Sequence, residues 1–215
     1  MRCVILYDNT SISNDLKPGW GFSAFIEAWN RKILFDTGAD GNILLQNMKR
    51  LSIDIKEITD IFISHPHWDH IGGLRDVLKL NSDIVLWIPL YFKELDSLPS
   101  PKEIVEVKEV RKLYEGIYST GRLDEIEQAL CIESSKGVIV FVGCSHPDIK
   151  DILSVASDLG DIYGVIGGLH SNRVEHLQGI KLICPTHCTY YKSRFRELFK
   201  EGYIEGGVGR IIELD

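Results

Sequence analysis

The stretch His65-Pro66-His67-Trp68-Asp69-His70 places three imidazoles and one carboxylate within six residues. It directly follows the apolar stretch 59–64, whose pattern is that of a short strand buried on both faces. His65 and His67 are two residues apart on extended backbone and project to the same side, whereas Asp69 and His70 follow the bend. A solvated surface loop is the alternative, but without a cation these imidazoles and the carboxylate would lie beside a buried strand with unfavourable electrostatic interactions. We therefore expect a metal site here.

Three further histidines each follow a predicted strand, as His65 does. They are His146 after residues 138–143, His170 after 161–166, and His187 after 180–184. Because the carboxyl ends of parallel strands meet at one edge of a sheet, we expect these side chains to converge near His65. A structural role in a turn or in the core is the alternative for each of them alone. His176 lies in a polar helical run, and we expect it at the surface.

Strand and helix patterns alternate along the rest of the chain. Strands are predicted at 2–7, 22–29, 32–35, 59–64, 84–88, 128–133, 138–143, 161–166, 180–184 and 208–214, and helices at 42–51, 74–78, 148–159 and 190–200. The segment 89–120 has three prolines and mixed charges, which predict a loop-rich insertion with short strands. Runs of strands with interspersed helices favour an α/β sandwich of two packed sheets with helices outside, formed by one domain over residues 1–215.

Composition restricts the class of protein. The 215 residues are 44% hydrophobic and 26% charged with a net charge of −7, which is typical of a globular chain. The longest apolar runs fall far short of the roughly 20 residues that cross a bilayer, and the start does not have the pattern of a secretory signal. We expect a cytoplasmic protein with its five cysteines reduced. A small-molecule substrate is expected, with no nucleic-acid and no membrane partner; the oligomeric state is not predicted.

The H-x-H-x-D-H stretch resembles the signature of the metallo-β-lactamase superfamily. The resemblance extends over nearly the whole chain, and in particular over 34–38, 64–73, 142–146, 166–170, 185–188 and 207–209. The combination is most similar to the dihydropteroate-synthase-like branch, which includes archaeal dihydropterin-ribofuranosylaminobenzene-phosphate synthases and many hydrolases. This resemblance implies an αββα sandwich with a metal site at one edge.

The resemblance also implies two divalent metal ions held by six side chains. These are His65, His67 and a third histidine, for which we expect His146, at one ion, and Asp69, His70 and His187 at the other. Zinc is the first expectation, with manganese or iron as alternatives, because nitrogen and oxygen ligands do not determine the metal.

Two further side chains have roles that the sequence leaves open. Most of the superfamily has a bridging Asp where this chain has Cys144, so Cys144 is a candidate ligand or a small packed residue. Without the bridging carboxylate, one tightly bound ion is the alternative to two. In the resembled family Asp36 accepts a hydrogen bond from a ligating imidazole; a buried turn carboxylate without that role is the alternative.

Metal-assisted hydrolysis of a small phosphorylated or ester-like substrate is the leading functional hypothesis. Asp69 is expected to orient the attacking water besides binding metal, and His170 to act as proton donor or substrate-oxygen partner. A transferase that joins a pterin diphosphate to an aminobenzene-ribofuranosyl phosphate and releases pyrophosphate is one alternative. A non-catalytic metal-binding protein is the other. Candidate aromatics for stacking on a pterin are Trp20, Trp68, Tyr91 and Tyr114, and segments 9–21 and 89–120 are expected to wall the pocket.

Overall fold

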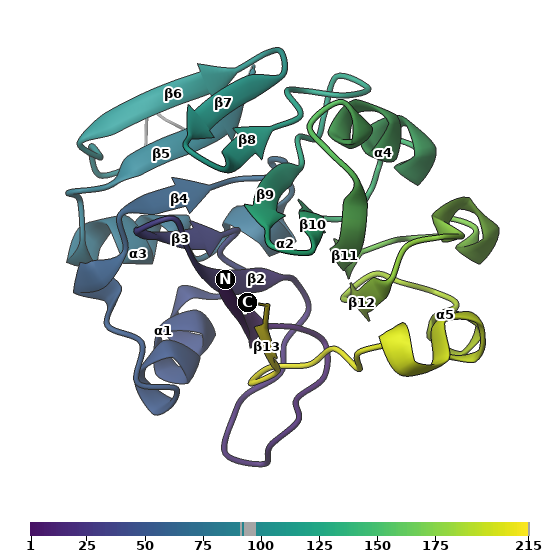
Figure 1. Cartoon of the computed structure of the whole chain (residues 1–215). Helices are drawn as coiled ribbons and strands as arrows, with labels where there is room; N and C mark the ends of the chain where they lie inside the picture. Colours follow the sequence, from purple (N-terminus) through teal and green to yellow (C-terminus); the bar gives the residue numbers. More distant parts are fainter. Residues whose placement is uncertain (91, 93–97, 215) are drawn as a thin grey trace.

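The computed structural model describes residues 1–90, 92 and 98–214 and consists of two β-sheets packed face to face (Figure 1). The first sheet has seven strands in the order β13-β1-β2-β3-β4-β5-β6. The second has six strands in the order β12-β11-β10-β9-β8-β7. Helices lie outside both sheets, with α1 and α3 beside the first and α4 and α5 beside the second (Figure 1).

The first sheet begins as an antiparallel meander and continues as a parallel sheet. Its strands are β1 (Arg2–Tyr7), β2 (Ser23–Ala28), β3 (Arg31–Phe35), β4 (Asp60–Phe62), β5 (Val85–Pro89), β6 (Glu103–Val107) and β13 (Ile211–Glu213). Strands β3 to β6 run parallel to one another. The short strand β4 therefore lies inside the sheet, which explains why its sequence is apolar on both faces.

The second sheet is antiparallel at one side and parallel at the other. Its strands are β7 (Arg111–Tyr114), β8 (Ile117–Ser119), β9 (Leu130–Ser134), β10 (Gly137–Val142), β11 (Ile162–Gly168) and β12 (Leu182–Thr186). Strands β10, β11 and β12 are parallel, with Val142 paired to Gly167 and Gly168 to Thr186 near their ends. The carboxyl ends of these three strands therefore meet at one edge, as the sequence predicts.

In the part of the chain that the structure describes, four helices cover the outer faces of the sheets with their apolar sides. They are α1 (Gly41–Arg50), α3 (Leu74–Leu80), α4 (Ile149–Ser157) and α5 (Lys192–Phe199). The single turn α2 (Trp68–Ile71) instead buries Asp69 and His70, and the 3₁₀ turns are η1 (Ile55–Glu57), η3 (Val174–Leu177) and η4 (Lys200–Gly202). Asp40 caps α1 by accepting hydrogen bonds from the backbone N–H groups of Asn42 and Ile43. Leu44 and Met48 of α1 are buried in the outer core of the first sheet.

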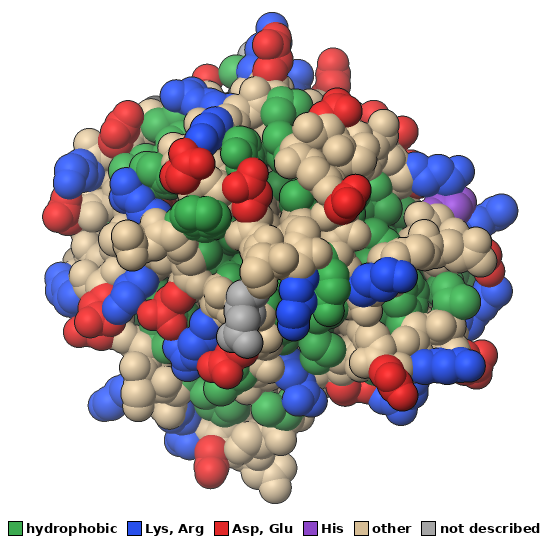
Figure 2. All heavy atoms as spheres, in the orientation of Figure 1, with side chains coloured by type: hydrophobic (Ala, Val, Ile, Leu, Met, Phe, Trp, Pro, Cys, Tyr) green, Lys and Arg blue, Asp and Glu red, His purple; other side chains and the backbone are tan. Residues whose placement is uncertain are grey.

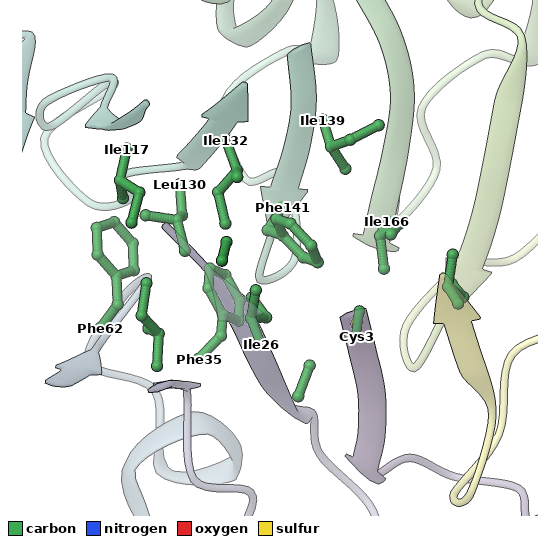
Figure 3. Packing of buried hydrophobic residues seen from close by; sticks show 14 of the residues in the cluster. Cys3, Ile26, Phe35, Phe62, Ile117, Leu130, Ile132, Ile139, Phe141 and Ile166 are labelled. Atoms are coloured by element: carbon green, nitrogen blue, oxygen red, sulfur yellow. The ribbon is translucent and has the colours of Figure 1, made fainter. Parts of the chain in front are cut away.

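The main hydrophobic core lies between the two sheets (Figure 3). Phe35 and Phe62 of the first sheet stack with ring centroids 5.6 Å apart, and Phe35 also meets Phe141 of the second sheet at 6.2 Å. Two smaller cores fill the spaces between each sheet and its helices. The layers are thus helices, sheet, sheet, helices, which confirms the predicted αββα sandwich.

The segment 89–120 is more than an insertion. Its short strands are present as predicted, but β6 extends the parallel part of the first sheet, and β7 and β8 form the far side of the second. The segment therefore carries the chain from one sheet to the other. Residues 91 and 93–97 of this segment lie outside the described residues.

Every helix in the described part of the chain is too short or too polar to span a membrane. Figure 2 shows acidic and basic side chains intermixed over the face in view, without a continuous basic surface.

Candidate metal centre

Four loops that follow strand ends converge at one edge of the sandwich. The loops after β4, β10, β11 and β12 carry, in that order, His65 with the rest of its motif, His146, His170 and His187. The imidazoles touch one another, with ring centroids of His65, His67 and His146 all 4.6–4.7 Å apart. The structure thus brings together all the histidines that the sequence assigns to the site.

His65, His67 and His146 form a first group of nitrogen atoms. His146 Nε2 lies 3.2 Å from His65 Nε2 and 3.1 Å from His67 Nδ1. Because one Nε2 carries at most one hydrogen, these two contacts are not both satisfied as donated hydrogen bonds. Nitrogen ligands at 2.0–2.1 Å from a tetrahedral zinc ion are separated by about 3.3 Å. The spacing therefore fits three ligands of one cation.

Asp69, His70 and His187 form a second group. Asp69 Oδ2 lies 3.2 Å from His187 Nε2, which is buried and has no hydrogen-bond partner of acceptable geometry among the described residues. His70 Nε2 lies 3.2 Å from the sulfur of Cys144. An orphaned buried nitrogen beside a carboxylate and a thiol is a donor set that fits a second divalent ion.

Cys144 lies between the two groups. Its sulfur is within 4.8 Å of ligand atoms of His65 and His146 on one side and of His70 and His187 on the other. The sulfur of this buried thiol is therefore close to nitrogen atoms of both groups.

A hydrogen-bond chain behind the ligands orients two of the imidazoles. Asp36 Oδ2 lies 2.7 Å from His70 Nδ1 and accepts a hydrogen bond from Ser64 Oγ. Ser64 Oγ in turn lies 2.8 Å from His65 Nδ1, from which it accepts. Both Nδ1 atoms are engaged in this way, so each Nε2 faces the interior of the site. Asp36 is thus a buried carboxylate in contact with the imidazole of a candidate ligand, His70.

Asn9 is a member of the site that sequence reasoning missed. Its Oδ1 lies 2.9 Å from His187 Nδ1, and its amide group donates to the His187 carbonyl at 3.0 Å. Asn9 therefore does for His187 what Asp36 does for His70. It lies in the segment 9–21, which was assigned only to the pocket wall because an asparagine in a polar loop gives no sequence signal of its own.

Glu127 is the second residue that was missed. Its carboxylate is buried and accepts hydrogen bonds from four consecutive backbone N–H groups, at 2.9–3.1 Å. The donors are Gly143, Cys144, Ser145 and His146. Glu127 therefore fixes the loop that presents His146. The signal available in the sequence was an acidic residue at the start of the apolar stretch 128–133.

Burial and neighbouring charges set the protonation of the site. Burial, followed by the surrounding imidazoles, lowers the pKa of His65 well below its usual range and that of His146 to about 4. Burial also acts to lower the pKa of His70, but the adjoining Asp36 carboxylate raises it overall. Burial opposes ionisation of Asp69, yet His187 and His70 bring its pKa down to about 2. Except at His70, these shifts favour the neutral imidazoles and the ionised carboxylate that bind a metal.

The loops at the site contain residues in uncommon backbone conformations. Ser145, His170 and His187 have φ values of 54°, 43° and 42°, in the left-handed region. Each follows closely after the end of a strand, and such conformations cost of the order of 1–3 kcal/mol per residue. Gly143 permits the close approach of two loops, because a Cβ there would lie 2.1 Å from Ser64 Oγ.

His170 lies at the rim of the cluster. Its ring is 4.8 Å from that of His146, and a ring nitrogen lies within 4.8 Å of the sulfur atoms of Cys144 and Cys188. Burial, followed by the charge of neighbouring imidazoles, lowers its pKa. His170 therefore faces the site as a neutral imidazole outside the two groups of ligand atoms.

Aromatic side chains flank the imidazoles at two points. The Trp20 ring meets that of His187 at 5.1 Å and is 56% exposed, and the Tyr190 ring, 68% exposed, meets that of His170 at 6.3 Å. Trp68 is exposed on α2, within the motif itself.

The predicted stacking aromatics Tyr91 and Tyr114, and the predicted surface residue His176, are not confirmed by the described part of the structure. Tyr114 is not near the metal ligands: it packs on Trp87, and its hydroxyl donates to Asp60 at the opposite end of β4 from His65. Tyr91 lies outside the described residues. His176 is less exposed than the sequence predicts: it is half-buried, with a side chain 19% exposed, and lines a cavity next to His146. It lies in η3, between the buried residues Val174 and Leu177.

Comparisons with known proteins agree with this geometry. The model of the metallo-beta-lactamase superfamily matches residues 17–187. A Methanocaldococcus jannaschii protein named 7,8-dihydropterin-6-methyl-4-(beta-D-ribofuranosyl)-aminobenzene-5'-phosphate synthase is 28% identical over 91% of both chains.

Two solved structures share the fold. The structure of Tm1679, described as a metal-dependent hydrolase of the beta-lactamase superfamily, has a TM-score of 0.76 at 23% identity and covers 100% of this chain and 99% of its own. A diphosphatase of the PhnP family has a TM-score of 0.69 at 16% identity, covering 100% and 98%. At these identities the two structures establish the fold alone.

Proposed function

The chain belongs to the metallo-beta-lactamase superfamily, and on this basis we propose that it is a metal-dependent hydrolase of a small phosphorylated or ester-like substrate. The observation that carries the proposal is the set of imidazole nitrogens at 3.1–3.2 Å around His146, beside the orphaned Nε2 of His187. Such a cluster is energetically unfavourable without a cation and well suited to one.

The proposed ligands divide into the two groups described above. His65, His67 and His146 hold one ion, and Asp69, His70 and His187 hold the other, with Cys144 between them as a candidate shared ligand. Imidazole, carboxylate and thiolate together favour zinc, and manganese or iron are less suited to the thiolate. A divalent ion bound here lowers the pKa of its water towards about 7 and polarises an oxygen of the substrate.

The side chains around the ligands supply the remaining steps. Asp69, ionised at neutral pH because its pKa is about 2, is placed to accept a hydrogen bond from the attacking water. His170 is placed to hydrogen-bond the substrate oxygen and to exchange its proton, since it lies at the rim of the cluster, with its ring against that of His146. The five cysteines are free thiols, which is consistent with the proposed cytoplasmic location.

A pterin-dependent transferase is the second candidate. It is favoured by the 28% identity, over 91% of both chains, to the protein named as a synthase. In this reaction a pterin diphosphate would be joined to an aminobenzene-ribofuranosyl phosphate with release of pyrophosphate. Trp20 and Tyr190, exposed beside His187 and His170, could stack on flat rings of the two substrates.

A substrate panel separates these activities. Metal-loaded protein is incubated with phosphoesters, thioesters, lactones, and a pterin diphosphate with and without its acceptor, and the products are quantified. Hydrolysis of a panel member, abolished in Asp69→Asn and in metal-stripped protein, is expected. Pyrophosphate release that requires the acceptor would replace the hydrolase by the transferase. Bound metal without turnover on any substrate would leave a metal-binding protein that is not an enzyme.

A further inference from the structure

A polar cavity of about 390 Å³ opens beside the imidazole cluster. His146 and His170 form its wall on the side of the candidate metal ligands. Arg173, just before η3, and His176, within η3, also line it. The cavity lies between the start of α4 and the loop that follows β11, which contact each other through Ile149 and Asn172. Its volume is sufficient for a small polar group of a substrate.

The walls of the cavity are fixed to one another. The Asn172 side chain donates to the Ser145 carbonyl at 3.2 Å and accepts from the Ile149 N–H at 3.0 Å. Leu169 and Val174, on either side of the loop, are buried in the core outside the second sheet. The backbone that carries Arg173 is therefore attached to the loop that carries His146, and a group bound by Arg173 is held at a defined place relative to the ligands.

Two side chains that line the cavity, Arg173 and His176, have polar atoms without a hydrogen-bond partner among the described residues. Arg173 is exposed and forms no ion pair with any described residue, although the chain has a net charge of −7. His176 Nδ1 is buried without a hydrogen-bond partner among the described residues and lies 3.4 Å from Asp148 Oδ1. The Asp148 carboxylate is itself engaged, because it caps α4 by accepting from the Lys150 N–H. Among the described residues that line the cavity, the Arg173 guanidinium is thus the cation without an ion-pair partner, and Asp148 is an anion beside His176.

We propose that this cavity binds a second oxyanion of the substrate, held by Arg173 with His176 beside it, while the reacting group lies at the metal ligands. The inference rests on the proposed function and narrows its substrate class to compounds with two anionic groups. A guanidinium donates two parallel hydrogen bonds to a phosphate or a carboxylate, which fixes the direction of the bound molecule. The second anion is a phosphate or a carboxylate, and the probes below distinguish the two.

Binding of simple probes to metal-loaded protein tests the inference by calorimetry. Ethyl phosphate presents one anion. The bisphosphates of 1,3-propanediol and 1,4-butanediol present two at different spacings, and 4-phosphooxybutanoate replaces the second phosphate by a carboxylate. The wild-type protein is expected to bind at least one two-anion probe about tenfold more tightly than ethyl phosphate. Arg173→Gln should abolish this advantage and change ethyl phosphate binding by less than about twofold.

Arg75→Gln is the matched control, because Arg75 is an exposed arginine on α3. It should leave all four affinities unchanged. Equal affinities in wild type and Arg173→Gln, or an equal loss for ethyl phosphate and for the two-anion probes, would overturn the inference. If ethyl phosphate does not bind the metal-loaded wild type, this result counts against the proposed function and not against the cavity. The role of the cavity is then decided by whether binding of the two-anion probes depends on Arg173.

Discussion

His170 differs from the other site histidines in lying at the rim of the cluster, where its ring meets His146 and Tyr190. We expect His170→Ala to reduce turnover by about 100-fold or more, because a group that exchanges protons with the substrate is lost. Metal content, measured by elemental analysis, should stay at the wild-type level. His67→Ala, which removes a nitrogen of the first group, should reduce both. Equal loss of metal and turnover in His170→Ala would make His170 a ligand.

Glu127 stabilises the His146 loop through four backbone hydrogen bonds to one buried carboxylate. In Glu127→Gln one acceptor oxygen is replaced by an amide that cannot accept, so we expect the free energy of unfolding to fall by about 2–4 kcal/mol. Urea unfolding of the metal-free protein measures this. Glu133→Gln is the control, because Glu133 is only partly buried and its side chain accepts from the Tyr118 hydroxyl, and it should lose less than about 1 kcal/mol. Similar losses in the two variants would refute the role given to Glu127.

At the residue scale, the sequence predicts ligands better than the groups that orient them. Four candidate ligands are recognisable because they are close together in one motif. Glu127 and Asn9 act on residues that are distant in sequence, through backbone N–H groups or a single side-chain contact, and these contacts exist only after the strands have paired. The partial burial of His176 likewise depends on η3 and not on its polar neighbours.

Tyr114 illustrates how elements of the two sheets are joined. Its hydroxyl, on β7, donates to Asp60 of β4 at 2.8 Å, and Trp87 of β5 donates to the same oxygen atom at 2.8 Å. Burial, with the Asp60 carboxylate, raises the pKa of Tyr114, so the phenol stays protonated and donates. We expect Tyr114→Phe to reduce the free energy of unfolding by about 1–2 kcal/mol with turnover unchanged.

Tyr118→Phe provides the comparison for this variant in thermal unfolding. Tyr118 is half-buried, and its hydroxyl donates to Glu133 at 3.1 Å. Its loss should cost less than about 0.5 kcal/mol. A Tyr114→Phe protein as stable as Tyr118→Phe would contradict a joining role for the Asp60 cluster.

At the element scale, the periodicity of apolar residues predicts a strand or helix wherever that element buries an apolar face. Strands β1, β10 and β11 and helices α1 and α4 appear close to their predicted bounds. The segment 89–120 was the least well predicted, because β6 and β7 lie at sheet edges and have mostly exposed residues. Strand pairing, and not local apolar patterning, defines such edge strands.

For the whole molecule, the crowded imidazoles predict a loss of stability towards acid in the metal-free protein. Burial lowers the pKa of His65, His67, His146, His170 and His187, whereas Asp36 raises that of His70. A histidine whose pKa is lower in the folded protein than in the unfolded chain is protonated in the unfolded chain at a higher pH. Proton uptake therefore favours unfolding as the pH falls below about 6.5. His70 acts in the opposite direction but is a single group.

Urea unfolding of chelator-treated protein at pH 7.5 and pH 5 tests this. The free energy of unfolding should be smaller at pH 5, and the difference should shrink in His146→Gln, which lacks the group whose pKa is about 4. Equal or greater stability at pH 5 would show that the site histidines are not held neutral by burial.

At the same scale, the αββα layers follow from runs of strands and helices together with the motif, but the place of the last strand does not. In both sheets neighbouring strands are consecutive in sequence except for β13, from the far end of the chain, which pairs with β1. Such a pairing between distant strands is set by packing of the central core, which no local pattern records.

The metal content of the protein, by elemental analysis after purification without added metal and again after addition of zinc, is the most direct test of the account. Two groups of ligands imply about two equivalents of a divalent metal per chain, with zinc favoured. A chain that contains no bound metal and takes up none on addition would contradict the ligand assignment, and with it the proposed hydrolase.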